Sequence, residues 1–184
     1  VNGWAVDAGI PQSENNRLAA AWFDQALGRS LRQIAEEFRS YRISEAFKEA
    51  YRLFWDDFSG LYLEMVKPAY GQPIDAATLE ATKGYFDALM RVLHPFMPFV
   101  TEEIWQALAP RAEGASICVA PMPEPCQADE TLLARFELAK EVISSVRNIR
   151  NQKNLPQKEE LTLRVIADEN YPAEFAPVVM KMAN

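Results

Sequence analysis

The sequence predicts a mainly α fold, with a helical bundle over residues 1–155 and a small α/β element over residues 156–184. Three observations predict it. Several long segments place an apolar residue at about every third or fourth position, which keeps one face of a helix apolar. Capping residues and prolines separate these segments from one another. Only two short stretches, residues 116–120 and 161–166, have the pattern of a strand.

The first helix is expected to run from about Ser13 to Arg39, with Ser13 as its N-cap. One face of this helix is apolar and should be buried in the bundle. Its apolar residues follow at steps of three to five: Leu18, Trp22, Leu27, Leu31, Ile34 and Phe38.

The second helix shows the most regular pattern of the chain. We expect Ser44 to cap it and Pro68 to end it. Its apolar residues are spaced 4-3-4-3-4: Phe47, Tyr51, Phe54, Phe58, Leu61 and Met65. Trp55 and Tyr62 widen this face, so the helix is expected at the centre of the bundle.

The third helix is expected to start at Asp75 and to be broken by the segment 94–99. The two prolines of this segment lie three residues apart, and a proline in a helix interior removes a hydrogen bond and clashes with the preceding turn. Because Phe96 and Phe99 are apolar, we expect a buried bend, with both rings packed against the second helix.

The fourth helix is expected to be capped by Thr101 and ended by Pro110. Glu102 and Glu103 would then lie in its first turn, where negative charge meets the positive end of the helix dipole.

A fifth helix is expected from about Asp129 to about Asn151. The stretches 116–120 and 161–166 are expected to pair as two short strands, and residues 173–183 to form a last helix.

Composition excludes several classes of protein. The 184 residues include 19 Lys and Arg and 26 Asp and Glu, which gives a net charge of −7, and such a chain can build a core without disulfide staples. The two cysteines, Cys118 and Cys126, suit core or loop thiols in a reducing cytoplasm. The sequence shows no membrane-spanning stretch and no signal peptide. Because it begins at Val1 and stops at Asn184 within a helical pattern, we expect a piece of a longer protein.

Catalytic and metal sites are not expected in this chain. The single histidine, His94, cannot supply a three-histidine zinc site or a di-iron bundle, and no glycine-rich phosphate loop occurs. His94 itself is interpreted as a helix-terminal histidine that a carbonyl group or the helix dipole satisfies. We therefore expect no catalytic residue, no metal ligand and no cofactor here.

Two charged features remain. The pair Asp56–Asp57 lies between Trp55 and Phe58, so one carboxylate is expected to be partly buried against an arginine. Residues 140–158 contain five basic side chains and one acid, a local excess in an acidic chain. This basic segment is either a solvated face or a nucleic-acid contact, since Arg and Asn hydrogen-bond phosphates and base edges.

Several motifs resemble those of one known family. The motifs are Y-R-I-S at residues 41–44, F-W-D-D-F at residues 54–58 and Y-L-E…K-P at residues 62–68. They resemble the helical anticodon-binding domain of class I aminoacyl-tRNA synthetases.

The most specific motif is L-H-P-F-M-P-F-V-T-E-E-I-W at residues 93–105, which resembles a signature of the valyl-tRNA synthetase family. The stretch V-R-N-I-R…N-L-P at residues 146–156 resembles another motif of that family. The isoleucyl and leucyl families share a looser form of the first motif. The matches together cover about residues 1–167, most of the chain.

The resemblance implies a parent enzyme that uses ATP and Mg²⁺ to attach valine to tRNA-Val. The HIGH and KMSKS motifs of its catalytic domain are absent here, and so are its editing domain and C-terminal coiled coil. This chain would be the anticodon-reading module of a monomeric enzyme. Its partners would be the anticodon stem-loop and the catalytic domain, with no role for DNA or a membrane. The alternatives are an isoleucyl or leucyl enzyme, or a helical protein-interaction module without an RNA role.

The resemblance also suggests which side chains contact RNA. At the end of the second helix these are Tyr62, Leu63, Glu64 and Lys67, with Leu63 as an apolar platform for an unstacked base. Arg147 and Arg150 would contact the tRNA backbone. Alternatively, the two arginines pair with bundle acids such as Glu102 or Asp57 and only hold the fifth helix in place.

Overall fold

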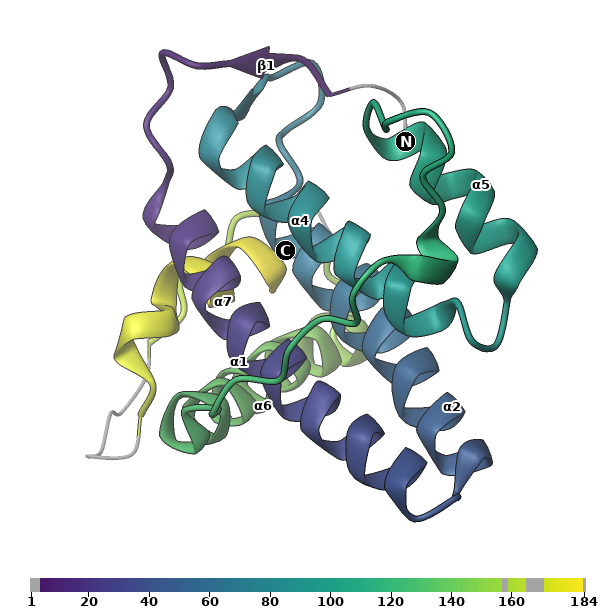
Figure 1. Cartoon of the computed structure of the whole chain (residues 1–184). Helices are drawn as coiled ribbons and strands as arrows, with labels where there is room; N and C mark the ends of the chain where they lie inside the picture. The colour runs from purple at the N-terminus through teal and green to yellow at the C-terminus, as the bar shows by residue number, and fades with distance from the viewer. Residues whose placement is uncertain (1–3, 157–158, 165–170, 184) are drawn as a thin grey trace.

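The computed structural model describes residues 4–156, 159–164 and 171–183, and confirms the mainly α fold (Figure 1). The long helices are α1 (Glu14–Arg39), α2 (Ile43–Arg52), α4 (Ala76–Leu93), α5 (Pro98–Leu108) and α6 (Glu130–Gln152). Shorter helical segments are η1 (Leu53–Tyr62), α3 (Leu63–Val66), η2 (Ile117–Val119), η3 (Ala173–Phe175) and α7 (Ala176–Met182). None of the described helices has the length and apolar character needed to cross a membrane.

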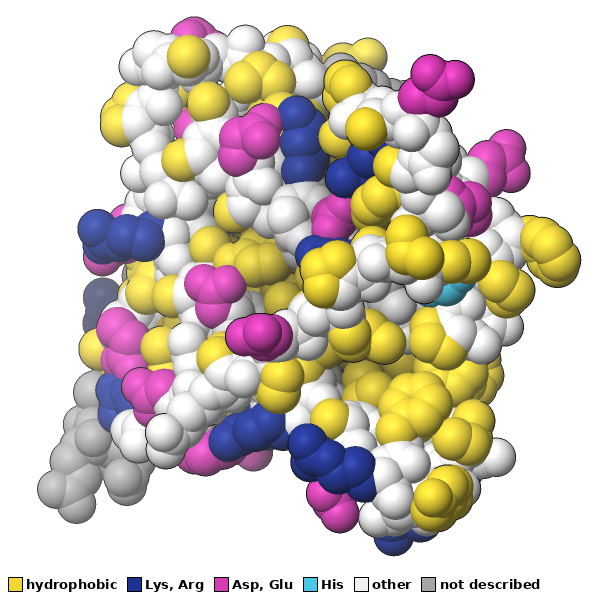
Figure 2. All heavy atoms as spheres, viewed as in Figure 1, with side chains coloured by type: hydrophobic (Ala, Val, Ile, Leu, Met, Phe, Trp, Pro, Cys, Tyr) yellow, Lys and Arg dark blue, Asp and Glu magenta, His cyan; other side chains and the backbone are white. Residues whose placement is uncertain are grey.

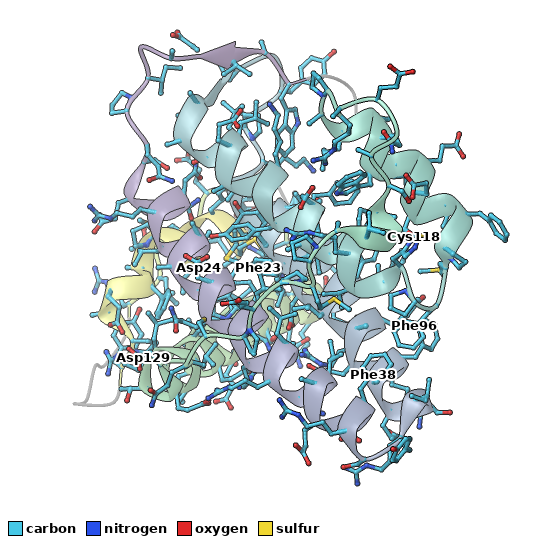
Figure 3. The ribbon with its side chains drawn as sticks, viewed as in Figure 1. Phe23, Asp24, Phe38, Phe96, Cys118 and Asp129 are labelled. Carbon is cyan, nitrogen blue, oxygen red and sulfur yellow. The ribbon has the colours of Figure 1, made fainter. Side chains whose placement is uncertain are left out.

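Helix α1 is the element on which the others pack. Helices α2, α4, α6 and α7 all contact it, and α5 packs on α4. Phe23, at the middle of α1 (Figure 3), is fully buried among Phe58, Tyr62 and Tyr85, with ring centroids 4.9–5.4 Å away. These aromatic contacts join α1, η1 and α4 into one core.

The second aromatic contact of α1 reaches the C-terminal part of the chain. Trp22 stacks on Phe136 of α6 at 4.2 Å, and Phe136 meets Phe175 of η3 edge-on at 5.3 Å. Residues 173–182 are helical, which confirms the expected last helix. This helix packs against α1, α3 and α6.

Three predicted helix starts are confirmed by their caps. The side chains of Ser13, Asp75 and Asp129 each accept a hydrogen bond from a backbone N–H in the first turn of α1, α4 and α6, respectively.

Ser44 is not the N-cap that the sequence suggested, because α2 begins one residue earlier, at Ile43. The turn from α1 decides this start. The N–H of Arg42 donates to the Glu37 carbonyl and the N–H of Tyr41 to the Phe38 carbonyl, the two bonds of a Schellman motif. Tyr41 takes the left-handed conformation that this motif requires, with φ of 57°.

The second predicted helix is continuous but not α-helical throughout. Segment η1 is π-helical, and the N–H of Leu63 bonds to the carbonyl of Phe58, five residues back. The wider turn shifts the buried stripe, so Leu53, Phe58 and Tyr62 face the core.

Three aromatic residues that were expected in the core consequently lie on the outside of α2 and η1. Phe47, Tyr51 and Trp55 are 37%, 49% and 58% exposed, and the rings of Tyr51 and Trp55 are stacked. Figure 2 shows hydrophobic side chains gathered at the lower right, where Figure 3 labels Phe38 and Phe96.

The predicted bend is confirmed, with corrections. Helix α4 ends at Leu93 and α5 starts at Pro98, where the missing N–H of proline costs nothing. Phe96 is half-buried between Phe38 and Phe47, with ring centroids at 5.8 and 5.1 Å (Figure 3). Phe99 is 90% exposed, so its predicted burial is wrong.

Thr101 is not an N-cap, because it lies inside the first turn of α5 and its hydroxyl donates to the Met97 carbonyl at 2.8 Å. Glu102 and Glu103 therefore lie beyond the first residues of the helix rather than at its start. The side chain of Glu102 instead accepts hydrogen bonds from Ser116 and from the N–H of Ile117.

The predicted strand pair is wrong where the structure describes it. Residues 117–119 form the short 3-10 helix η2, which Ser116 caps, and residues 161–164 are not in a strand. Val165 and Ile166 lie outside the described residues. Among the described residues the strands are β1 (Val6–Asp7) and β2 (Ile74–Asp75), which pair in parallel.

Asp57 is the buried carboxylate that the sequence predicted, and Arg52 is its arginine. The Arg52 guanidinium donates to Asp57 at 2.8 Å and to both oxygens of Glu49 at 2.6 and 3.0 Å. Ser30 of α1 donates to Glu49 at 2.6 Å. Burial raises the pKa of Asp57, with Arg52 opposing. Burial also acts to raise the pKa of Glu49, but hydrogen bonds from Arg52 and Ser30 outweigh it and lower the pKa.

Replacing Arg52 by methionine should lower the free energy of unfolding by about 3 kcal/mol, the lower end of the range for breaking a buried ion pair. The physical reason is that Glu49 and Asp57 stay buried without their cation. Urea unfolding of the chain measures the change. Lys83→Met is the control, because the Lys83–Glu80 pair is exposed and should contribute less than about 1 kcal/mol. Equal losses in the two variants would contradict the prediction.

Asp75→Asn should produce a stability loss that depends on pH. Burial acts to raise the pKa of Asp75, but hydrogen bonds from Thr78 and Asn16 outweigh it and hold the pKa below its ordinary value. A carboxylate with a lowered folded-state pKa stabilises the fold above its unfolded pKa of about 4. The difference in free energy of unfolding between wild type and variant should be largest at pH 7. It should shrink as the pH falls through the folded-state pKa of Asp75. Urea unfolding at several pH values tests this, and a constant difference would contradict it.

Candidate nucleic-acid interface

Two adjoining clefts lie on either side of the segment that follows α3. The first has a volume of about 310 Å³ and is lined by Glu64, Lys67, Pro68, Ala69, Arg147, Lys181 and Met182. The second has a volume of about 370 Å³, and its polar lining includes Asn15, Gln72 and Asp75. Because the clefts share Lys67, Pro68, Ala69 and Lys181, they form one surface, which we call the Lys67 groove.

The end of α3 positions the centre of this groove. Lys67 leaves the helix with ψ of 123°, the extended conformation favoured before a proline, and Pro68 follows. Asn15, in the first turn of α1, donates to the Met65 carbonyl at 2.7 Å and so ties this helix end to α1. The backbone is thereby fixed where the side chain of Lys67 enters the groove.

Three cations from three separate elements meet in the first cleft. Lys181 of α7 donates to the Lys67 carbonyl at 2.7 Å, and Arg147 of α6 donates to the Met182 carbonyl at 2.9 Å. The ammonium of Lys67 lies 3.3 Å from the Glu64 carboxylate. The cleft therefore combines three positive side chains with a single negative one.

The pKa of Lys181 is lowered mainly by its partial burial in the cleft. Burial lowers the pKa of Lys181, and the charge of Lys67 lowers it further, while Glu64 acts in the opposite direction. An anion in the cleft would favour the charged form of Lys181, because an opposite charge nearby stabilises an ammonium.

The groove brings together three of the residues that the sequence singled out: Glu64, Lys67 and Arg147. Leu63 is partly buried against the core beside Glu64. Two other expected RNA contacts lie in the interior. The ring of Tyr62 is 0% exposed, and its hydroxyl hydrogen-bonds to Thr82 at 2.9 Å.

Arg150 is the second expected contact that the structure buries, at 5% exposure. Its guanidinium donates to the carbonyls of Pro156 and Glu159 at 3.1 and 3.0 Å, so it holds the chain that leaves α6. The alternative pairing with Asp57 is not what the structure shows, because Asp57 pairs with Arg52.

Lys181, Asn15 and Gln72 are groove residues that sequence reasoning missed. Lys181 is 114 positions from Lys67 in the chain, and only the packing of α7 against α3 brings them together. No local pattern in the sequence signals such a meeting.

The side chains of the groove suit a ligand that carries several phosphates and has bases whose edges can form hydrogen bonds. Lysine and arginine side chains neutralise phosphates, whereas amides and carboxylates can hydrogen-bond base edges. No group of three or more His, Cys, Asp or Glu side chains in the described part of the chain is arranged to hold a metal ion.

Comparison with known proteins identifies the family to which the chain belongs. A family model for the anticodon-binding domain of tRNA ligase matches residues 20–167. The chain is 52% identical to the valine–tRNA ligase of Parabacteroides distasonis, 50% to that of Phocaeicola vulgatus and 47% to that of Porphyromonas gingivalis. Each similarity extends over 184 residues, which is all of this chain and 21% of the relative, so the chain spans about a fifth of those proteins.

The two arginines of α6 should differ in their effect on stability. Arg150→Met should lower the free energy of unfolding by about 2 kcal/mol, because the buried guanidinium and its hydrogen bonds to two carbonyls are lost. Arg147→Met should cost less than about 1 kcal/mol, because Arg147 is exposed. Urea unfolding of the two variants compares them, and a larger loss for Arg147→Met would contradict the assignment.

Proposed function

Because the chain belongs to the family of anticodon-binding domains of tRNA ligases, we propose that the Lys67 groove binds the anticodon stem-loop of a tRNA. The observation that carries the proposal is the convergence of Lys67, Arg147 and Lys181 in one cleft of an otherwise acidic chain. Phosphate contacts would come from these cations and fix the position of the RNA strand.

Base recognition is assigned to the side chains around the end of α3. Sequence-specific RNA binding depends on unstacked bases, which are held on apolar or aromatic planes and hydrogen-bonded at their edges. Leu63 would provide an apolar contact at the edge of the bundle, and Glu64 would accept hydrogen bonds from a base. Asn15 and Gln72 supply amides in the second cleft.

Tyr62 and Arg150 would act indirectly. The ring of Tyr62 packs against Phe23 and Tyr85, which holds η1 where it leads into Leu63. Arg150 fixes the last turn of α6, three residues after Arg147. Loss of either side chain would therefore disturb the groove through the fold.

The protein to which this chain belongs would be a valine–tRNA ligase, a cytoplasmic and monomeric enzyme that joins valine to tRNA-Val with ATP and Mg²⁺. This proposal is supported by the relatives, which are valine–tRNA ligases and so favour valine over the isoleucyl and leucyl alternatives. In that enzyme this chain would bind the anticodon loop of the tRNA, and the catalytic domain would perform the chemistry.

Salt-dependent binding of tRNA tests the groove directly. In the full-length protein, Lys67→Gln, Arg147→Gln and Lys181→Gln should each weaken binding of tRNA-Val. Each should also lower the slope of log affinity against log salt by about 0.7 for each lost phosphate contact on a single strand. Fluorescence titrations at four or five salt concentrations provide the slopes.

Lys83→Gln is the matched control, because Lys83 is also an exposed lysine with a glutamate partner three residues away but lines neither cleft. Its salt slope should equal that of wild type. If the three groove variants keep the wild-type slope and affinity, the RNA surface lies elsewhere on the molecule.

A further inference from the structure

The bend between α4 and α5 brings a cysteine against the only histidine of the chain. Cys118 lies on η2, beside the bend and at the surface (Figure 3). Its Sγ is 3.1 Å from Nε2 of His94, and the other ring nitrogen, Nδ1, is 2.8 Å from Oγ1 of Thr101. The sequence had suggested a carbonyl group or the helix dipole as the partner of His94.

The hydrogen bonds of Thr101 determine which nitrogen of His94 carries the proton. The Thr101 hydroxyl has one proton, and it lies 2.8 Å from the Met97 carbonyl oxygen, which can only accept. The hydroxyl oxygen therefore accepts the Nδ1–H of His94. In the neutral ring Nε2 is then the acceptor, and it faces the thiol of Cys118.

This arrangement has the three parts of an activated nucleophile. The thiol is the nucleophile, His94 is a base within hydrogen-bond distance, and Thr101 orients the base. Thr101 is 1% exposed, so its position is fixed by packing. Cys118 itself is exposed, so small molecules can reach it.

Charged groups around the pair come from both neighbouring helices. Glu102 of α5 holds the η2 segment through Ser116 and Ile117, and hydrogen bonds from Gln106 and Ser116 lower the pKa of this carboxyl. Arg91 of α4 donates to the Pro121 carbonyl at 2.8 Å, and its charge is paired with Asp87 at 2.7 Å.

The second cysteine provides an internal comparison. Cys126 is exposed as well, but its sulfur lies over Gly28 of α1, where an added Cβ would come within 2.3 Å of it. The chain has no second histidine that could serve Cys126 as a base.

We propose that Cys118 is a reactive thiol that forms mixed disulfides with low-molecular-weight disulfides, with His94 as its general base. The Cys118 proton passes to Nε2 of His94, and the sulfur attacks one sulfur of the disulfide. A new Sγ–S bond forms, the old S–S bond breaks, and the leaving thiolate takes the proton from His94. The products are one mixed disulfide and one free thiol, so no other oxidant is needed.

The test compares the two cysteines within one protein. The full-length protein is treated with oxidised glutathione or iodoacetamide at pH 7, and peptide mass spectrometry follows modification of Cys118 and Cys126 over time. We expect Cys118 to react about tenfold faster than Cys126. This factor is smaller than the roughly 10²–10⁴-fold that general base catalysis typically supplies, because a thiol without a base already reacts at a slow rate of its own. Equal rates at the two cysteines would overturn the proposal.

Variants of the partners separate activation from mere exposure. His94→Gln should slow Cys118 to about the rate of Cys126 and leave Cys126 unchanged. Thr101→Ser keeps the hydroxyl and should retain the fast reaction, whereas Thr101→Val should lose it. Thermal unfolding, followed by circular dichroism, shows whether each variant is folded. If His94→Gln is misfolded, the comparison of Thr101→Ser with Thr101→Val tests the role of His94 instead. A fast Cys118 in both folded His94→Gln and folded Thr101→Val would overturn the role of His94.

Discussion

The bidentate ion pair between Arg52 and Glu49, extended to Asp57, is the interaction on which the arrangement of the second helix depends. Two carboxylates inside a core are tolerated only with a cation and further hydrogen bonds, and Arg52 and Ser30 supply both. Since Ser30 belongs to α1, the same cluster fixes α2 against α1. Asp57 lies within the π-helical segment η1, so the cluster also determines which side of that segment faces inward.

The orientation of η1 determines the surface on one side and the groove at its end. Leu53, Asp57 and Tyr62 face inward. Tyr51 and Trp55, two positions before Leu53 and Asp57, therefore lie outward. At the far end, η1 continues into α3 and delivers Glu64 and Lys67 to the groove. The exposed aromatic side chains of α2 and η1 and the polar groove are therefore two results of the same helical register.

Local signals in the sequence were sufficient for the helices and insufficient for their register. The cap at Ser13 and the helix starts at Asp75 and Asp129 could be predicted, because a cap bonds within its own turn. The predicted caps Ser44 and Thr101 were wrong, because the preceding turns set those helix starts. The π-helical segment could not be predicted, because its wide turns depend on packing against α1. For the groove, motifs indicated Glu64, Lys67 and Arg147, but residue type alone did not distinguish the exposed Arg147 from the buried Arg150. Lys181 required the fold.

An acidic chain can hold an RNA site because the relevant charge is local. Exposed charges more than about 10 Å apart are largely screened at moderate salt, so the net charge of −7 acts weakly on a ligand inside the groove. Within the groove, Lys181 and Lys67 repel each other, which contributes to the lowered pKa of Lys181. A phosphate between them would attract both ammonium groups and favour the charged form of Lys181. At the groove that we propose, a phosphate chain would therefore meet three neighbouring cations in spite of the net charge of −7.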